Sequence, residues 1–341
     1  MIEVRSLTKS YGDRRAVDRL TFTAPAGRVT GFLGPNGAGK TTTFRCLLGL
    51  AAPTSGEALI DGRPYRELTA PRRQVGAVLE SIGFHPSRRG RDHLRVLARS
   101  AGLDGRRIDA VLTTVGLDDA ADRPVGGYSL GMKQRLGLAG ALLGDPSVVV
   151  LDEPANGLDP EGVRWVRQLL RTWADEGRTV LVSSHQLAEI AQVVDRVVIV
   201  RDGTAVVDED VAALADQQVS VRAEPIGPLL QALADAGVDH RRLRDGTVAV
   251  GGVGADEVGR IAAAAGVVVT ELTRPSAVAA LESLFLAATG NGAPTADPEV
   301  TTPTRPTRPT RPTGTTEAAE TTGPAGPTAG DGPAEAEEVR S

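Results

Sequence analysis

The chain has 341 residues, a formal net charge of −5, 41% hydrophobic residues and one cysteine, Cys46. This length predicts about two domains, and the acidic balance gives no electrostatic reason to expect nucleic acid as a partner. A lone cysteine excludes an intramolecular disulfide, which suits a reducing compartment. No run approaches the ~20 apolar residues that a membrane-spanning helix needs, and the first residues do not resemble a secretion signal.

A glycine-rich loop follows the first strongly apolar strand that the sequence predicts. The strand ends at Leu33, and a helical pattern begins by Phe44. The loop between them fits G-x-x-x-x-G-K-[ST], in which backbone N–H groups and the helix start surround a β-phosphate. In this pattern Lys40 reaches the β- and γ-phosphates, and the Thr41 hydroxyl binds Mg²⁺. We therefore expect a nucleoside triphosphate to contact Gly34, Pro35, Asn36, Gly37, Ala38, Gly39, Lys40, Thr41 and Thr42.

A mainly helical region is expected next. Residues 92–101, 108–115 and 131–142 repeat apolar side chains at intervals of three and four, which is typical of amphipathic helices. They predict a helical subdomain over about 81–145, inserted between the phosphate loop and the next strand.

Two carboxylates end the following strand. Residues 147–154 read SVVVLDEP, a β-branched run that suits a parallel strand buried on both faces. Open α/β sheets bind ligands at the carboxyl ends of their strands. We expect Asp152 to hold the Mg²⁺ shell there and Glu153 to polarise the attacking water.

The remaining elements divide the chain into three parts. A helix at 161–176, a strand at 179–183 and a hairpin turning at Asp202-Gly203 complete a first domain, 1–210. Residues 217–289 predict the order βαββαβ plus a helix, a small ferredoxin-like α+β domain without a catalytic cluster. Residues 291–341 are rich in Pro, Thr and Gly and lack aromatics, which predicts a disordered tail.

The order of the motifs resembles the ATP-binding subunit of ABC transporters, over roughly residues 1–203. That family places an adenine-stacking aromatic at Tyr11, its signature at Tyr128–Met132, its D-loop at 156–159 and its switch histidine at His185. The resemblance implies a P-loop NTPase fold, ATP and Mg²⁺ as ligands, and an ATPase. It also implies that His185 contacts the γ-phosphate. The signature and the D-loop add Ser129, Gly131 and Asp159 to the expected nucleotide contacts.

Two positions depart from the family pattern. Only Ser129 and Gly131 remain of the five signature letters. Glu80 stands where the family usually has a glutamine, and it is expected to contact Mg²⁺ or the catalytic water. A glutamate at this position is similar to the bacitracin-resistance and lantibiotic-immunity subfamily of exporters.

The resemblance implies a subunit that powers export, for example of an antibiotic or a peptide, through a separate membrane permease. It further implies that two copies enclose two ATPs and that the subunit lies at the cytoplasmic face of the membrane. Two other functions stay open on sequence grounds. One is an ABC protein that acts on ribosomes or DNA, and the other is an ATP-binding regulator that does not hydrolyse.

Overall fold

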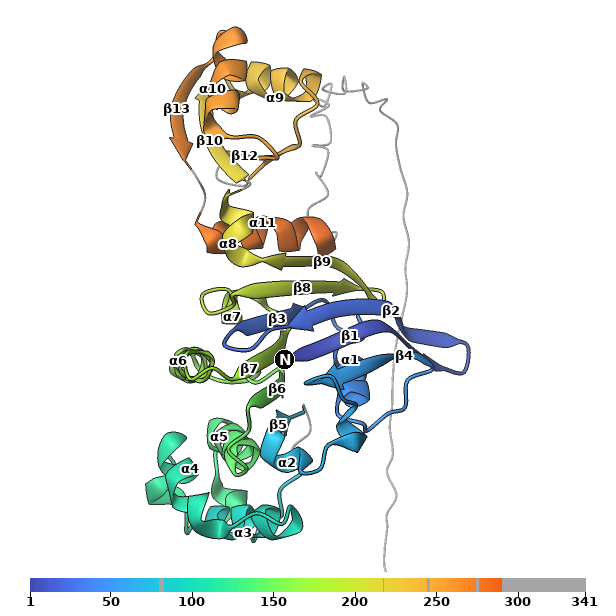
Figure 1. The fold of residues 1–341 in the computed structure, drawn as a ribbon. Helices are drawn as coiled ribbons and strands as arrows, with labels where there is room; N and C mark the ends of the chain where they lie inside the picture. The colour runs from blue at the N-terminus through green and yellow to red at the C-terminus, as the bar shows by residue number, and fades with distance from the viewer. Residues whose placement is uncertain (80–82, 217, 244–245, 274–275, 290–341) are drawn as a thin grey trace, which may run out of the picture. The chain divides into compact units, whose positions relative to one another are not determined.

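The computed structural model describes residues 1–79, 83–216, 218–243, 246–273 and 276–289 (Figure 1). Two expectations fall outside these ranges. Glu80 is one, and the tail at 291–341 is the other. Within the described residues, no helix is long and apolar enough to cross a membrane.

A small antiparallel sheet begins the chain. Strand β1 (Ile2–Tyr11) lies between β2 (Arg14–Ala24) and β4 (Ser55–Ile60). The β1–β2 hairpin turns over two residues, so that Tyr11 and Arg14 face each other across the strands. This sheet covers one side of helix α1 (Lys40–Leu47).

A six-stranded sheet forms the centre of the molecule. Its order is β5-β6-β7-β3-β8-β9, with every neighbouring pair parallel except β8–β9. This arrangement confirms the predicted α/β fold with parallel strands, and the Asp202-Gly203 turn joins the last two strands. The strands are β3 (Val29–Leu33), β5 (Val75–Val78), β6 (Val148–Asp152), β7 (Thr179–Ser184), β8 (Arg196–Arg201) and β9 (Thr204–Asp210).

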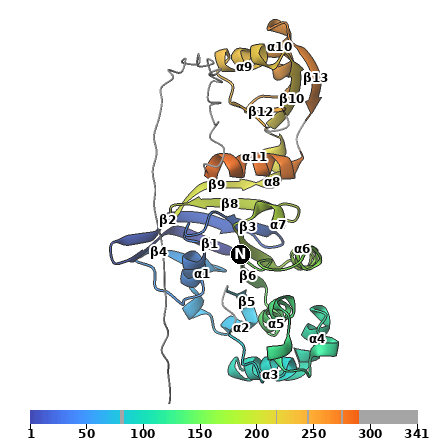
Figure 2. The same ribbon diagram turned by 180° about the vertical axis from the view of Figure 1, so that it is seen from behind.

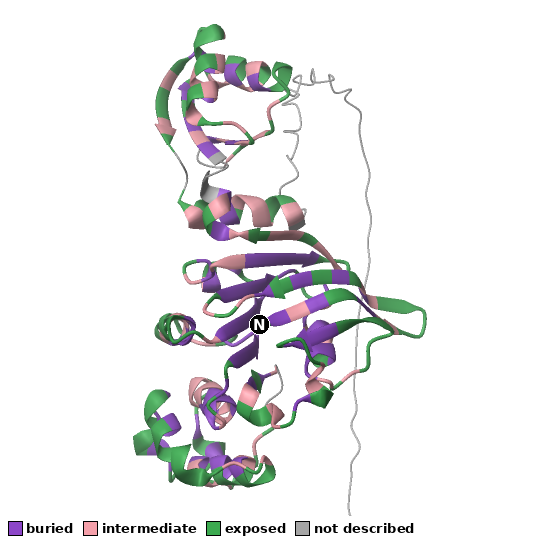
Figure 3. Cartoon of the chain, in the orientation of Figure 1, coloured by how far each residue is buried: buried purple, intermediate pink, exposed green. Residues whose placement is uncertain are grey.

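Aromatic rings join the two sheets through helix α1. Phe32 of β3 lies 5.0 Å from Phe22 of β2 and 5.5 Å from Phe44 of α1, between ring centroids. All three rings are fully buried. Figure 3 colours the strands of the central sheet mostly purple, which marks buried residues. Burial of such rings contributes much of a core's stability and fixes the phosphate loop, which directly precedes α1.

Helices cover the other face of the central sheet. The predicted helical subdomain contains α3 (Gly90–Ser100), α4 (Ile108–Thr114) and α5 (Leu130–Leu142), close to the expected bounds. Helices α6 (Pro160–Asp175) and α7 (Leu187–Ile190) pack nearby. The short helices are η1 (Tyr65–Glu67), α2 (Pro71–Gln74), η2 (Gly105–Arg107), η3 (Asp118–Ala120) and η4 (Val125–Gly127).

A second, smaller antiparallel sheet has the order β11-β12-β10-β13, which is the split βαβ arrangement of ferredoxin-like folds. It has a hydrophobic core of its own. The elements are β10 (Gln218–Glu224), α9 (Ile226–Asp235), β11 (His240–Arg242), β12 (Val248–Gly251), α10 (Ala255–Ala264) and β13 (Val268–Thr273).

The last helix packs elsewhere than its place in the sequence suggests. Sequence order places it with the ferredoxin-like unit, but α11 (Ala277–Thr289) contacts α8 (Val211–Asp216) and β8. Ala280 and Leu281 are fully buried within the core of the nucleotide-binding part. The reason is that β9 and α8 contribute the apolar residues Val207, Val211 and Leu214 at this edge of the core, and the apolar residues of α11 pack in the same cluster. Figure 2 shows α8 and α11 beside β9 from behind.

Candidate nucleotide-binding site

A cavity of about 670 Å³ opens at the carboxyl ends of the central strands. Its walls come from the first hairpin, the phosphate loop and the ends of β6 and β7. The lining residues are Tyr11, Arg14, Ala16, Asn36, Gly37, Gly39, Lys40, Thr41, Thr42, Glu153, Asn156 and His185. The structure thus brings together most of the residues that the sequence assigns to ATP.

The phosphate loop surrounds a buried lysine. The Lys40 ammonium donates hydrogen bonds to the carbonyl oxygens of Gly34 (2.7 Å) and Pro35 (3.3 Å). Gly39 precedes it with φ 105°, and a Cβ there would lie 2.5 Å from the carbonyl oxygen of Ala16. Only glycine therefore allows the loop to pass this close to β2 and begin α1 with its N–H groups free for an anion.

The Thr41 hydroxyl and the Asp152 carboxylate lie side by side and are hydrogen-bonded. The Thr41 hydroxyl donates to one Asp152 carboxylate oxygen at 2.7 Å, and the Ser183 hydroxyl donates to the other at 2.6 Å. Hard oxygen donors of this kind suit Mg²⁺, which usually takes one or two carboxylates plus substrate phosphates. No group of three or more His, Cys, Asp or Glu suited to a metal occurs among the described residues, so the metal would depend on the nucleotide as well.

Glu153 lies between Lys40 and His185. One carboxylate oxygen is 3.4 Å from the Lys40 ammonium, and the other is 2.8 Å from His185 Nδ1. The Lys40 and Glu153 side chains are only 6% and 9% exposed, so each charge depends on its partner. The backbone of Glu153 has φ 52°, a left-handed conformation that is costly for a side chain with a Cβ. Such strain, together with the bond from its N–H to the Ser183 hydroxyl (2.9 Å), fixes where the carboxylate points.

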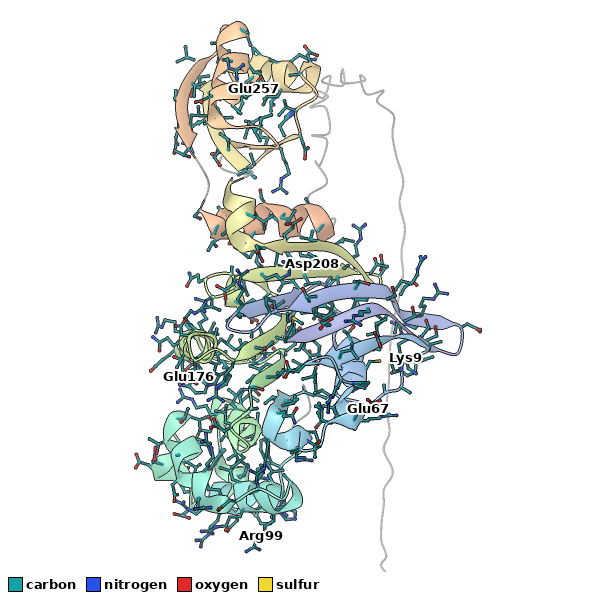
Figure 4. All side chains as sticks on the ribbon, in the orientation of Figure 1. Lys9, Glu67, Arg99, Glu176, Asp208 and Glu257 are labelled. Atoms are coloured by element: carbon teal, nitrogen blue, oxygen red, sulfur yellow. The ribbon has the colours of Figure 1, made fainter. Side chains whose placement is uncertain are left out.

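Tyr11 stands at the outer end of the cavity. Its ring is half exposed, and the Lys9 ammonium lies 4.7 Å from the ring centroid on one side. Figure 4 shows Lys9 on the β1–β2 hairpin. Lys9 is not among the cavity-lining residues, so the ring is held from outside the cavity and can offer its other face to an adenine.

The predicted residues Gly34, Pro35, Ala38 and Asp152 lie next to lining residues without lining the cavity themselves, whereas three predicted contacts belong to other segments. Ser129 caps helix α5 by accepting the N–H of Met132 at 3.2 Å, and Gly131 lies in the first turn of that helix. Asp159 caps α6 by accepting the N–H of Gly162 at 2.7 Å. The two segments adjoin each other, because a Cβ on Gly157 would lie 2.6 Å from the Leu130 side chain. The signature therefore adjoins the D-loop, while Ser129, Gly131 and Asp159 do not line the cavity that contains the phosphate loop of the same chain.

Sequence reasoning assigned no nucleotide contact to four residues of the site, of which Ala16 lines the cavity through β2 and Asn156 was named only as part of the D-loop. Ser183 orients both Asp152 and Glu153, although its only signal is a hydroxyl at the end of a neighbouring strand. Asn156 and Arg14 line the cavity. Arg14 is marked in the sequence only by its closeness to Tyr11, which does not distinguish it from the other arginines nearby.

Comparison with known proteins agrees with this geometry. The family model described as "ABC transporter" matches residues 17–156, and a domain of unknown function matches residues 217–282. The bacitracin transport ATP-binding protein BcrA of Bacillus licheniformis is 45% identical over 206 residues, which are 60% of this chain and 67% of BcrA. The lantibiotic transport ATP-binding protein SrtF of Streptococcus pyogenes is 35% identical over 212 residues, 62% of this chain and 91% of SrtF.

A solved structure described as the ATP-binding subunit of an ABC transporter superposes with a TM-score of 0.57 at 27% identity. It covers 63% of this chain and 91% of its own. The fold and the site define a P-loop ATPase. The chain belongs to the ABC transporter ATP-binding family and is an ATP-hydrolysing subunit of that family. The ribosome, DNA and non-hydrolysing alternatives find no support among these relatives.

Proposed function

We propose that this subunit hydrolyses ATP to power export of an antibiotic or a peptide through a separate membrane permease. The observation that carries the proposal is the convergence of the phosphate loop, Glu153 and His185 in one cavity, with Asp152 hydrogen-bonded to the lining residue Thr41. The names of BcrA and SrtF support the transport of a bacitracin-like or lantibiotic-like compound.

The residues of the site have different roles in phosphoryl transfer to water. Lys40 and the loop N–H groups bind and neutralise the β- and γ-phosphates, and Tyr11 stacks on adenine. Thr41 and Asp152 would hold Mg²⁺, whose positive charge would stabilise the negative charge on the phosphate oxygens. Glu153 accepts the proton of the attacking water. His185 orients Glu153 through the 2.8 Å contact of its Nδ1 and is proposed to contact the γ-phosphate.

The signature surface supports a dimer. Ser129, Gly131 and Asp159 do not line the cavity of their own chain, and Leu130, between the first two, is 58% exposed. The start of helix α5 offers backbone N–H groups to an anion. We propose that this surface closes over the γ-phosphate bound by a second copy, so that each ATP lies between two chains.

A second cavity supports docking of the permease. It measures about 530 Å³ and lies between β5 and helices α3 and α5. Its walls are mostly apolar, with Arg72 and His93 as polar exceptions, and Leu50 at its rim is 66% exposed. This composition suits an amphipathic helix from the cytoplasmic side of a membrane protein. The subunit would then lie at the cytoplasmic face of the membrane.

Glu80 is proposed to couple ATP hydrolysis to the permease. Leu79, directly before it in the sequence, and Gly83, three residues after it, line the second cavity. We propose that its carboxylate contacts Mg²⁺ or the attacking water. Glu80→Gln, which nearly preserves volume, should then change ATPase and transport several-fold, and Glu80→Ala should reduce both further. Parental behaviour of both variants would contradict this role.

The central experiment measures ATPase and export together. The subunit is reconstituted in vesicles with a permease encoded by a neighbouring gene, and uptake of bacitracin and of a lantibiotic into inverted vesicles is followed. Lys40→Ala should abolish ATP binding and transport, whereas Arg45→Ala, on the exposed side of the same helix, should leave both intact. ATP turnover with no movement of either compound would contradict the proposed cargo. Turnover by Lys40→Ala would contradict the assigned site.

A further inference from the structure

Arg14 is a cationic residue that lines the ATP cavity and has no role in the proposed mechanism. It begins strand β2, directly opposite Tyr11 in the hairpin register. Residues directly opposite in an antiparallel pair point to the same face of the sheet. Both side chains accordingly line the cavity.

The position of Arg14 along β2 places it between the two ends of the site. Ala16 also lines the cavity, and its carbonyl oxygen abuts the phosphate loop at Gly39. A strand advances about 3.3 Å per residue, so Arg14 lies roughly 7 Å from Ala16 toward the adenine end. A flexible arginine there reaches the part of the nucleotide that joins the base to the β-phosphate.

The Arg14 side chain makes no hydrogen bond or ion pair with the described residues, although those of its neighbours do. Arg15 pairs with Asp18 at 3.0 Å, and Arg19 lies 3.4 Å from the same carboxylate. Lys40, the other permanent cation of the cavity, is already occupied by Glu153 and two carbonyl groups. An unpaired guanidinium facing a nucleotide cavity is suited to a phosphate oxygen, with which it forms charge-assisted hydrogen bonds.

We propose that Arg14 binds the α-phosphate of the nucleotide. The inference rests on the proposed ATP site and adds a contact that discriminates nucleotides from nucleosides. It also gives the hairpin two tasks, with Tyr11 holding the base and Arg14 holding the first phosphate. The contact is made equally with ATP and ADP, so it contributes binding and not the chemical step.

The test compares four ligands that differ by one phosphate at a time. Adenosine, AMP, ADP and ATP compete against a fluorescent ATP analogue on wild type, Arg14→Ala, Arg14→Lys and the control Arg15→Ala. Arg14→Ala should weaken AMP, ADP and ATP by a similar factor of about tenfold and leave adenosine unchanged. Arg14→Lys should recover part of the loss, and Arg15→Ala should match wild type. In ATPase assays Arg14→Ala should raise KM by the same factor, with kcat unchanged at saturation.

Each other outcome overturns the proposal in a recognisable way. Equal weakening of adenosine would assign Arg14 to the base or the ribose. Weakening of ATP alone would assign it to the γ-phosphate, and unchanged affinities would exclude a contact. If the wild type does not bind ATP although its thermal melt shows a folded protein, the ATP site itself is overturned. A changed melting temperature for Arg14→Ala alone would point to a structural role.

Discussion

The backbone N–H of Gly203 donates a hydrogen bond to the carbonyl oxygen of Ala38, with 3.1 Å between nitrogen and oxygen. Ala38 lies in the phosphate loop, and Gly203 lies in the turn between β8 and β9. The carbonyl oxygen of Gly203 in turn accepts the N–H of Asp18 on β2 at 2.9 Å. This turn therefore connects the loop that binds phosphate with the sheet that carries Tyr11.

The first prediction concerns this turn. Gly203 has φ 80°, and a Cβ there would lie 3.0 Å from the Ala16 carbonyl oxygen and from the Val17 Cα. Gly203→Ala should cost about 1–3 kcal/mol of the free energy of unfolding, and it should weaken ATP binding because the loop shifts. Thermal melts and ATP titration measure the two effects.

Gly177→Ala is the matched control for that substitution. Gly177 has φ 87°, but a Cβ at this residue would meet no atom within 4 Å, so the change imposes backbone strain without a collision. It should lower stability and leave ATP affinity at the parental value. Equal ATP affinities for the two variants would show that the turn does not position the phosphate loop.

The second prediction separates ATP binding from hydrolysis. Glu153→Gln removes the proton acceptor but keeps the size of a side chain that contacts Lys40 and His185. ATP hydrolysis should fall by about 10²–10⁴-fold, the usual contribution of a general base. Two chains should remain together around uncleaved ATP, which size-exclusion chromatography with ATP and Mg²⁺ detects. A monomer at every concentration would contradict the proposed dimer.

The third prediction tests the packing of α11. Leu281 is fully buried, whereas Leu286 on the same helix is 39% exposed. Leu281→Ala should lower the free energy of unfolding by about 2–4 kcal/mol, because a cavity remains in the core. Leu286→Ala should cost much less. Chemical denaturation of both variants provides the comparison, and equal losses would argue against the observed packing.

The fourth prediction is a pH dependence of stability. Burial lowers the pKa of His93 below its ordinary value of 6.5, with a smaller contribution from Arg88, and its Nδ1 has no hydrogen-bond partner among the described residues. A base with a depressed pKa binds fewer protons in the folded state than in the unfolded state. Stability should therefore fall as the pH drops below about 6.5 and continue to fall until the folded pKa is passed.

Replacing His93 isolates its share of that loss. His93 packs against Phe84 with 4.9 Å between ring centroids, so His93→Phe keeps an aromatic ring in place. The difference in stability between pH 7 and pH 5 should shrink in this variant, as urea titrations at about these two pH values would record. An unchanged difference in His93→Phe would assign the acid loss to other groups.

Much of the fold could be predicted because its signals are local. The hydrophobic spacing of residues 131–142 matches α5 almost to the residue, and Asp202-Gly203 marks the observed hairpin. The residue types of the phosphate loop predict phosphate binding without any other part of the chain. Residues of this loop line the cavity, as expected. The strand order of the small sheet also agrees with the predicted βαββαβ sequence.

What the sequence could not predict depends on contacts between distant segments. The apolar residues of α11 indicate a buried helix but do not say which core it covers. Ser183 gains its importance only because β7 lies beside β6, which brings its hydroxyl to Asp152. Arg14 is distinguished from Arg15 only by the face of the hairpin on which each lies, and the register shift within β1 and β2 hides that face from simple alternation.

The ferredoxin-like unit is framed by α8 and α11, which contact each other on the nucleotide-binding core. Its two connections therefore start and finish at neighbouring points, like the ends of a surface loop. The entropy of closing a loop grows only slowly with its length, so a segment inserted this way can be lengthened, shortened or exchanged at little thermodynamic cost. The unit can therefore be gained or exchanged between α8 and α11 during evolution while the ATPase core stays unchanged.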